Sequence, residues 1–344
     1  MCIRDRMEDI YDRCQVLILD AEGLEADDRA VEIVENYMEE DIDLVLAVGA
    51  GTIHDLSRFV AHQYRIPFVS VPTAASSDGF TSTVADMTWN GVKKTVAASA
   101  PLFVFADTDI FAKAPKRLTA AGVSDILGKY IALADWKIAS ILSEEYYCAE
   151  VVNLETRAVR TVKDNLKEIA AGEEEACEKL MYALVLSGLA MQMTGSSRPA
   201  SGAEHHLVHL WDMEVVNGHL DALHGEKVSG GTMLVLLEYK KIADAIRRGT
   251  CKVHTCTEED QELLKETFGK KGILGALEKE NTPEPLDDVS TRELSDALPR
   301  ILKIIDALPA VTDMQEMMNT AGCVSRVRDI GLPGEVIEES LLLA

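Results

Sequence analysis

Residues 44–72 read LVLAVGAGTIHDLSRFVAHQYRIPFVSVP. The apolar run Leu44–Val48 predicts a buried strand, Thr52–Gln63 a helix, and Phe68–Val71 a second buried strand closed by Pro72. A strand, a helix of about 10–15 residues and another strand are typical of a βαβ unit, whose strands lie parallel in one sheet. The segment therefore predicts an α/β domain.

The flanking residues extend this pattern. Val16–Asp20 (VLILD) predicts a further strand, Asp27–Glu40 an amphipathic helix, and Leu102–Ala106 (LFVFA) a final buried strand. Thr81–Ala97 alternates polar and apolar residues around Asn90-Gly91, which is a strong β-hairpin signal. These are few strands for a complete nucleotide-binding sheet, so we expect the amino end to be truncated. We expect the protein to start at Met7, and the six residues before it are left out of the fold prediction.

Long helical periodicity dominates after Lys113. The predicted long helices are Ala120–Ser140, Ser143–Asn165, Glu173–Met193, Ala200–Met213 and Gly225–Arg248. A chain of 344 residues is long enough for two cores. We therefore expect a Rossmann-like α/β domain over 7–113, with a parallel sheet and a β-hairpin, and an all-α domain over 114–344 that binds metal and substrate.

Composition excludes several classes of partner. The formal net charge of −24 argues against nucleic acid and against an anionic membrane, because both attract basic surfaces. No apolar run reaches the ~18 residues of a membrane span. The seven scattered cysteines are typical of reduced thiols, and we expect a cytoplasmic protein. Cys251, His254 and Cys256 lack the second ligand pair of a structural zinc site.

Two turns follow the predicted parallel strands. The first, GAGTIHD at 49–55, joins a strand to a helix, where glycines and the helix N-terminus favour a phosphate, and Thr52 could cap that helix. The second, PTAASSDG at 72–79, carries small hydroxyl residues. Since parallel strands end at one sheet edge, both turns should face the same crevice. The first turn is not the G-x-G-x-x-G fingerprint, so a plain strand-to-helix turn stays an alternative, as does a solvated loop for the second.

Five of the eight histidines lie between residues 205 and 224. His205 and His209 are four apart on a predicted helix and project from one face, whereas His206 points elsewhere. His224 begins the next long helix, beside Gly225, which permits close backbone approach. Imidazoles bind first-row divalent ions, and a catalytic site commonly adds a third, anionic ligand. Asp125 is the best candidate for that ligand, with a structural role as the alternative for each of these residues.

The segments GAGTIHD, PTAASSDG, GVSDILGK, SRPASGAEHHLVH and LHGEKV resemble the glycerol-1-phosphate dehydrogenase family. That family belongs to the wider group of iron-containing alcohol dehydrogenases, glycerol dehydrogenases and dehydroquinate synthases. The resemblance implies a dehydroquinate synthase-like fold and an NAD(P)-linked reduction of dihydroxyacetone phosphate to sn-glycerol 1-phosphate, a step of phospholipid biosynthesis. It also implies one divalent ion (Zn, Ni or Fe), a small phosphorylated substrate and a homo-oligomer.

The resemblance also assigns residues. It implies that Asp125, His205 and His224 bind the metal, and that Asp78, Asp125 and His209 contact substrate, with Asp125 and His209 catalytic. The implied cofactor contacts are Gly51, Thr52, Ile53, His54, Asp55, Thr73, Ala74, Ala75, Ser76 and Ser82. One departure is Arg58, where related enzymes often have Lys; the charge is kept.

Other functions remain open from the sequence. A glycerol or polyol dehydrogenase of the same group would need no phosphate-binding site. For the phosphate enzyme, Arg198 and Lys129 are candidate phosphate contacts, with a solvated surface role as the alternative for each. A dehydroquinate synthase-like lyase fits less well, because that group generally places Glu where this chain has Asp125. The third alternative is a module that binds metal or cofactor without catalysis.

Overall fold

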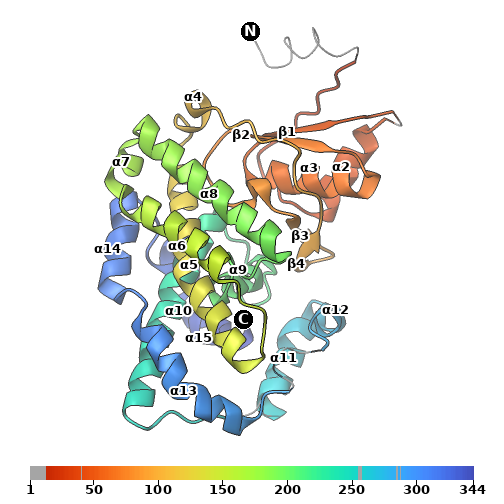
Figure 1. Ribbon diagram of the computed structural model, residues 1–344. Helices are drawn as coiled ribbons and strands as arrows, with labels where there is room; N and C mark the ends of the chain where they lie inside the picture. Colours follow the sequence, from red (N-terminus) through yellow and green to blue (C-terminus); the bar gives the residue numbers. More distant parts are fainter. Residues whose placement is uncertain (1–12, 40, 255–257, 284–285, 287) are drawn as a thin grey trace.

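The computed structural model describes residues 13–39, 41–254, 258–283, 286 and 288–344. The expected start at Met7 and the cysteine Cys256 lie outside these residues. Figure 1 shows the α/β part, coloured red to orange, beside and above a larger group of helices coloured yellow to blue. This arrangement confirms an α/β part followed by a helical part.

The α/β part contains the predicted βαβ unit. Its elements are α2 (Asp28–Tyr37), β1 (Val45–Gly49), α3 (Gly51–Tyr64), β2 (Phe68–Pro72), β3 (Val84–Trp89) and β4 (Val92–Ala97). β1 and β2 pair in parallel, from Val45 opposite Phe68 to Gly49 opposite Pro72. Because the strands end together, the two turns that follow them start at one sheet edge, as predicted.

The hairpin is also confirmed. β3 and β4 pair antiparallel, and Trp89 opposes Val92 across the turn. Asn90 and Gly91 both have positive φ, at 51° and 76°. A two-residue turn of this kind requires left-handed backbone at both positions, which Asn and Gly adopt at least cost.

Two predicted strands are wrong. Residues Val16–Asp20 form no strand, and Ile18 is 86% exposed, because within the described residues no neighbouring strand pairs with them. Leu102–Ala106 is not a buried strand either. A single parallel bridge joins Val104 to Ser70 of β2, while Phe103 and Phe105 stay 62% and 61% exposed. A hydrophobic run becomes a buried strand only where other elements cover it, and no described element covers these rings.

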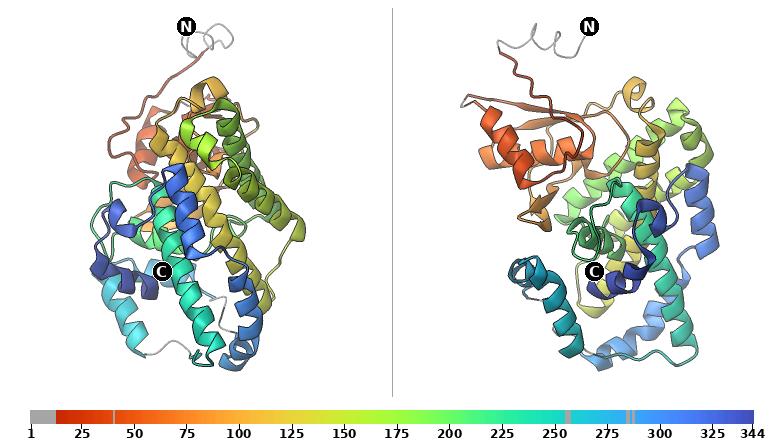
Figure 2. Two further views of the ribbon diagram at one scale, coloured as in Figure 1. Left: turned by 90° about the vertical axis from the view of Figure 1, so that its left-hand side faces the viewer. Right: turned by 180° about the vertical axis from the view of Figure 1, so that it is seen from behind.

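The helical part supplies the main core. Its helices are α4 (Thr108–Phe111), α5 (Lys116–Leu142), α6 (Ala149–Lys163), α7 (Leu166–Ala171), α8 (Glu174–Thr194), α9 (Ala203–Asp212), α10 (His224–Arg247), α11 (Glu258–Lys270), α12 (Leu274–Glu280), α13 (Thr291–Asp306), α14 (Val311–Ala321) and α15 (Ile337–Leu343). Short 3₁₀ helices lie at Gly79–Thr81 (η1), Val327–Ile330 (η2) and Gly334–Val336 (η3). Figure 2 shows α10 and α13 from two further sides.

α5 and α10 are the two longest helices of the described chain, and they pack against each other. The core around them contains Ile126, Leu127, Trp211 and Leu236, all buried. The residues of α5 from Thr119 to Lys129 are buried throughout, charged ones included. A helix buried on all sides can place polar side chains only where other groups satisfy them.

Within the described residues, no helix is both long and apolar enough to cross a membrane.

Some helix ends differ from the predictions. α6 begins at Ala149 and not at Ser143, because Ser143 terminates α5. α3 begins at Gly51 behind Ala50, so Thr52 lies inside the first turn and does not cap the helix. Local propensity sets helix boundaries weakly, and neighbouring turns decide them.

Candidate metal centre

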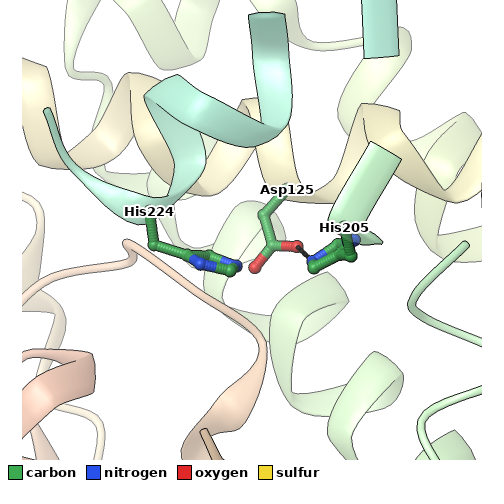
Figure 3. A group of neighbouring side chains, drawn as sticks. All are labelled: Asp125, His205 and His224. Atoms are coloured by element: carbon green, nitrogen blue, oxygen red, sulfur yellow. Dashed lines mark ion pairs between the residues drawn. The ribbon is translucent and has the colours of Figure 1, made fainter. Parts of the chain in front are cut away.

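Three side chains from three helices converge at the junction of the two parts. Asp125 comes from α5, His205 from α9 and His224 from the first residue of α10. One ligand atom from each lies within 4.8 Å of the others. His205 Nε2 is 3.9 Å from Asp125 Oδ1, and the two imidazole rings are 5.2 Å apart between centroids. Figure 3 shows both imidazoles flanking the carboxylate.

The Asp125 carboxylate is fixed on both oxygens. Oδ1 accepts a hydrogen bond from Lys129 Nζ at 2.8 Å, and Oδ2 accepts one from the backbone N–H of Asp78 at 2.9 Å. Burial alone would raise the pKa of Asp125, but Lys129 and the two imidazoles outweigh it and hold the pKa below its usual range. The group is therefore an anion facing the imidazoles, as a metal ligand must be.

Lys129 connects the two parts of the molecule. Its fully buried ammonium lies 2.7 Å from Asp78 Oδ2 of the turn after β2 and 2.8 Å from Asp125 Oδ1, and it donates to the Ala200 carbonyl at 2.9 Å. Ser187 Oγ also donates to Asp78 Oδ2, at 2.8 Å. The three donors of the ammonium are thus matched by three acceptors. Burial would lower the pKa of Lys129, but Asp125 and Asp78 raise it above its ordinary value.

The position of His224 depends on Gly225, the residue that follows it. A Cβ on Gly225 would stand 2.1 Å from the carbonyl oxygen of Ala121, so only glycine lets the start of α10 approach α5 this closely. This confirms the close backbone approach expected beside His224.

We expect Gly225→Ala to lower the free energy of unfolding by about 1–3 kcal/mol, the usual cost of overpacking, because backbone must shift to admit the methyl group. Urea denaturation measures the change. Gly269→Ala in α11 is the matched control, since its Cβ would meet nothing within 4 Å. Replacing glycine there should be neutral or stabilising by up to about 1 kcal/mol. Equal effects at both positions would contradict the close-approach argument.

The two turns of the α/β part meet beside the triad. Thr73 N–H donates to the Gly49 carbonyl at 3.0 Å, and a Cβ on Gly51 would stand 2.9 Å from Ser77 Oγ. Asp78, at the end of the second turn, reaches Asp125 through its backbone. Thus the predicted cofactor turns and the predicted ligands form one continuous region, as expected from the parallel strands.

Some predicted cofactor residues face inward. His54 is 1% exposed, donates from Nδ1 to the Ala50 carbonyl at 2.9 Å and packs edge-on against Phe80. Its burial lowers the pKa to about 4. Ser82 is likewise buried, and its hydroxyl accepts from Val84 N–H at 3.0 Å. These two side chains hold the turns in shape, and the backbone N–H groups of His54 and Ser82 donate to the carbonyls of Ala50 and Gly79, at 3.3 and 3.2 Å.

The remaining turn positions divide between buried and half-buried. Ala74, Ala75 and Ser76 are buried, whereas Gly51, Thr52, Ile53, Asp55 and Thr73 are half-buried. Arg58 is fully buried and donates to the carbonyls of Val84, at 2.6 Å, and Gly79. Its guanidinium thus ties α3 to the second turn and the hairpin, a role for which the positive charge matters.

His209 lies one turn beyond His205 on α9, and His206 is exposed, as the helical spacing predicts. His209 Nε2 is 3.6 Å from Asp86 Oδ1 of β3, and Lys93 Nζ of β4 is 3.1 Å from Asp86 Oδ2. Burial lowers the pKa of His209 to about 4, although Asp86 opposes the shift. The imidazole is therefore neutral near pH 7. Asp86 and Lys93 were missed from the sequence, because a charged hairpin is usually a solvated one.

The donor set fits a divalent cation. Two imidazole nitrogens and one carboxylate oxygen are typical of a catalytic site for Zn²⁺, Ni²⁺ or Fe²⁺, in which three protein ligands leave a position open. Glu204, a third residue missed from the sequence, is fully buried, and its Oε1 lies 2.7 Å from His205 Nδ1. Burial would lower the pKa of His205, but Glu204 raises it overall.

Both cations predicted as candidates for a phosphate-binding site have carboxylate partners in the structure. Lys129 is saturated within the buried cluster, and Arg198 pairs with Glu145 at 2.8 Å. The Cys251–His254–Cys256 segment falls partly outside the described residues. A cavity of about 650 Å³ lies elsewhere, between the start of α5 and the ends of α7 and α14, and none of the three triad residues lines it.

Comparison with known proteins points to one class. Residues 3–115 match the iron-containing alcohol dehydrogenase family. A crystal structure of glycerol dehydrogenase from Schizosaccharomyces pombe is similar in fold, with a TM-score of 0.55 and 21% identity, covering 97% of this chain and 85% of that one. The chain therefore has the fold of the iron-containing alcohol dehydrogenase class, with a triad whose donors suit a divalent ion.

Sequence relatives narrow the class. The chain is 35% identical over 333 residues to glycerol-1-phosphate dehydrogenase [NAD(P)+] of Geobacillus thermodenitrificans, covering 96% of this chain and 75% of the relative. It is 37% identical to the protein of the same name from Geobacillus stearothermophilus, covering 92% and 71%. The chain belongs to the glycerol-1-phosphate dehydrogenase family.

Proposed function

We propose that this protein is an NAD(P)-dependent sn-glycerol-1-phosphate dehydrogenase, which reduces dihydroxyacetone phosphate to sn-glycerol 1-phosphate. The observation that carries the proposal is the convergence of Asp125, His205 and His224 within 4.8 Å of one another, next to two turns suited to a dinucleotide. The names of its relatives, glycerol-1-phosphate dehydrogenase [NAD(P)+], supply the substrate class.

The proposal assigns the two parts of the chain. Residues 7–113 would form a Rossmann-like nucleotide-binding domain, and residues 114–344 a helical domain that binds metal and substrate in a dehydroquinate synthase-like arrangement. The five described cysteines are free thiols, which suits the cytoplasmic location that we also propose. Assembly as a homo-oligomer belongs to the same proposal, by analogy with the family.

Asp125, His205 and His224 would hold the divalent ion, which when bound supplies Lewis acidity toward a carbonyl oxygen, while a bound nicotinamide supplies the hydride. The protein's own contribution is geometry. The Asp78 N–H and the Lys129 ammonium fix the Asp125 carboxylate before any substrate arrives, so little reorganisation is needed at the reacting atoms.

The cofactor residues would act through backbone and small side chains. The half-buried Gly51, Thr52, Ile53, Asp55 and Thr73, with the backbone of His54, Ala74, Ala75, Ser76 and Ser82, form the two adjoining turns. N–H groups at the start of α3 would bind the pyrophosphate, because a helix N-terminus carries partial positive charge.

His209 would move the proton that the reduced oxygen needs. Its neutral imidazole can accept a proton at one ring nitrogen and donate from the other, so it can relay without being charged at rest. Asp86, 3.6 Å from its Nε2, would favour the imidazolium that forms transiently. Asp78 and Asp125 would complete the substrate contacts.

The test is a substrate panel with the metal-loaded protein. We expect NADH or NADPH oxidation with dihydroxyacetone phosphate at a kcat/KM at least about a hundredfold above that for dihydroxyacetone, because a site built for a charged group rejects analogues that lack it. The product should resist an sn-glycerol-3-phosphate-specific dehydrogenase. Comparable turnover of glycerol and dihydroxyacetone would favour a polyol dehydrogenase. Bound metal without turnover of any of these would favour a binding module.

A further inference from the structure

We propose that Glu204 is a positioning residue for the ion, which fixes the tautomer and the direction of His205; the proposal rests on the metal site proposed above. Glu204 is fully buried and directly precedes His205 in α9. Its Oε1 accepts from the Gly202 N–H at 3.0 Å and lies 2.7 Å from His205 Nδ1.

The hydrogen bond decides which ring nitrogen is free. A carboxylate only accepts hydrogen bonds, so the proton of this pair lies on His205 Nδ1. Nε2 then keeps its lone pair, and it is Nε2 that faces Asp125 Oδ1 at 3.9 Å. Ligating imidazoles commonly donate their other N–H to a carboxylate or carbonyl, which orients the ring and raises its basicity.

The backbone that carries Glu204 is itself fixed. The Ala203 N–H donates to Asp135 Oδ2 of α5 at 2.7 Å, and Tyr239 of α10 donates its hydroxyl to Asp135 Oδ1. The start of α9 is thus bound to the two helices that carry the other ligands. Because Oε2 of Glu204 has no hydrogen-bond partner among the described residues, Oε1 is the single oxygen through which the carboxylate acts.

The two imidazoles are held differently. Across the described part of the chain, no hydrogen bond fixes the ring of His224, which is placed by the start of α10 and its contact with α5. The ring of His205, in contrast, is held by a hydrogen bond to the carboxylate of Glu204. Loss of Glu204 should therefore loosen one ligand of three and leave the others in place.

The test measures metal binding without substrate or cofactor. We expect Glu204→Ala to weaken Zn²⁺ binding by about 10–100-fold, the usual effect of losing such a partner, and to shift the visible spectrum of the Co²⁺-loaded protein, which reports ligand geometry. Glu204→Gln preserves shape and can accept from Nδ1 with its amide oxygen, so we expect a smaller loss. If Glu204→Ala fails to fold, the Zn²⁺ affinity and Co²⁺ spectrum of Glu204→Gln provide the test.

Glu155→Gln is the matched control. Glu155 is equally buried, and among the described residues no hydrogen bond joins it to either imidazole. Burial raises its pKa to about 8, so it is largely neutral at pH 7 and glutamine replaces it without loss of charge. Its Zn²⁺ affinity and Co²⁺ spectrum should match wild type.

Wild-type affinity and an unchanged spectrum in both Glu204 variants would overturn the inference. Because the experiment measures metal binding and not turnover, failure of this inference can be told apart from failure of the proposed function. If the Glu204 variants bind Zn²⁺ more weakly but the wild-type protein does not turn over dihydroxyacetone phosphate, the substrate assignment is wrong and the role of Glu204 stands.

Discussion

Alanine in place of His205 or His224 is expected to remove bound metal and to lower kcat/KM by at least about a thousandfold. Two protein ligands cannot hold a catalytic divalent ion as three do. Loss of the Lewis acid forfeits several kcal/mol of transition-state stabilisation, and each 1.36 kcal/mol is a factor of ten. Metal content by elemental analysis and steady-state kinetics measure the two effects on the same samples.

His206→Ala is the control. It changes the same residue type, one position along α9, but at an exposed site outside the triad. Metal content and turnover should stay near wild type. If either triad variant kept a full equivalent of metal, the ligand assignment would be refuted.

Lys129→Met should cost about 3–5 kcal/mol of folding free energy. The ammonium is fully buried and neutralises Asp78 and Asp125, and removal of one partner from a buried ion cluster leaves uncompensated charge in a medium that solvates it poorly. The same change should disrupt the site, because Asp125 would lose one of its two orienting hydrogen bonds. Urea denaturation and Zn²⁺ binding measure both consequences.

Lys179→Met provides the comparison. Lys179 pairs with Glu175 on the surface of α8 at 3.0 Å, with 40% of its side chain exposed. Exposed pairs of this kind contribute about 0–1 kcal/mol, since water already solvates both charges. A Lys129 variant as stable as the Lys179 variant would show that the buried cluster is not what holds the two parts together here.

Local rules predicted the elements that depend on local residues. The βαβ unit followed from apolar runs and helix length, and the hairpin from Asn90-Gly91. The same rules failed for Val16–Asp20 and Leu102–Ala106, which have the composition of buried strands. Composition cannot say whether both faces of a segment will be covered, and here Ile18 is 86% exposed and Phe103 and Phe105 are 62% and 61% exposed.

The site was predicted in part. Helical spacing placed His205 and His209 on one face and His206 on another. Residue type and position made Asp125 and His224 further candidates, and the family resemblance then assigned Asp125, His205 and His224 as the ligands. Glu204, Asp86 and the central position of Lys129 were not foreseen. A Glu or Lys on a helix is usually solvated, so the only available signals were that Glu204 directly precedes a candidate ligand and that Lys129 lies one turn from another.

The sequence by itself determined the βαβ unit, the hairpin, the long helices and the helix faces that carry imidazole, because these follow from backbone periodicity and turn residues over short stretches. Only the tertiary structure decided that Asp125, His205 and His224 meet, that Lys129 is buried between Asp78 and Asp125, and that Glu204 faces His205. Those juxtapositions depend on how α5, α9 and α10 pack against the turn after β2, and packing between segments far apart in the chain is a property of the whole core.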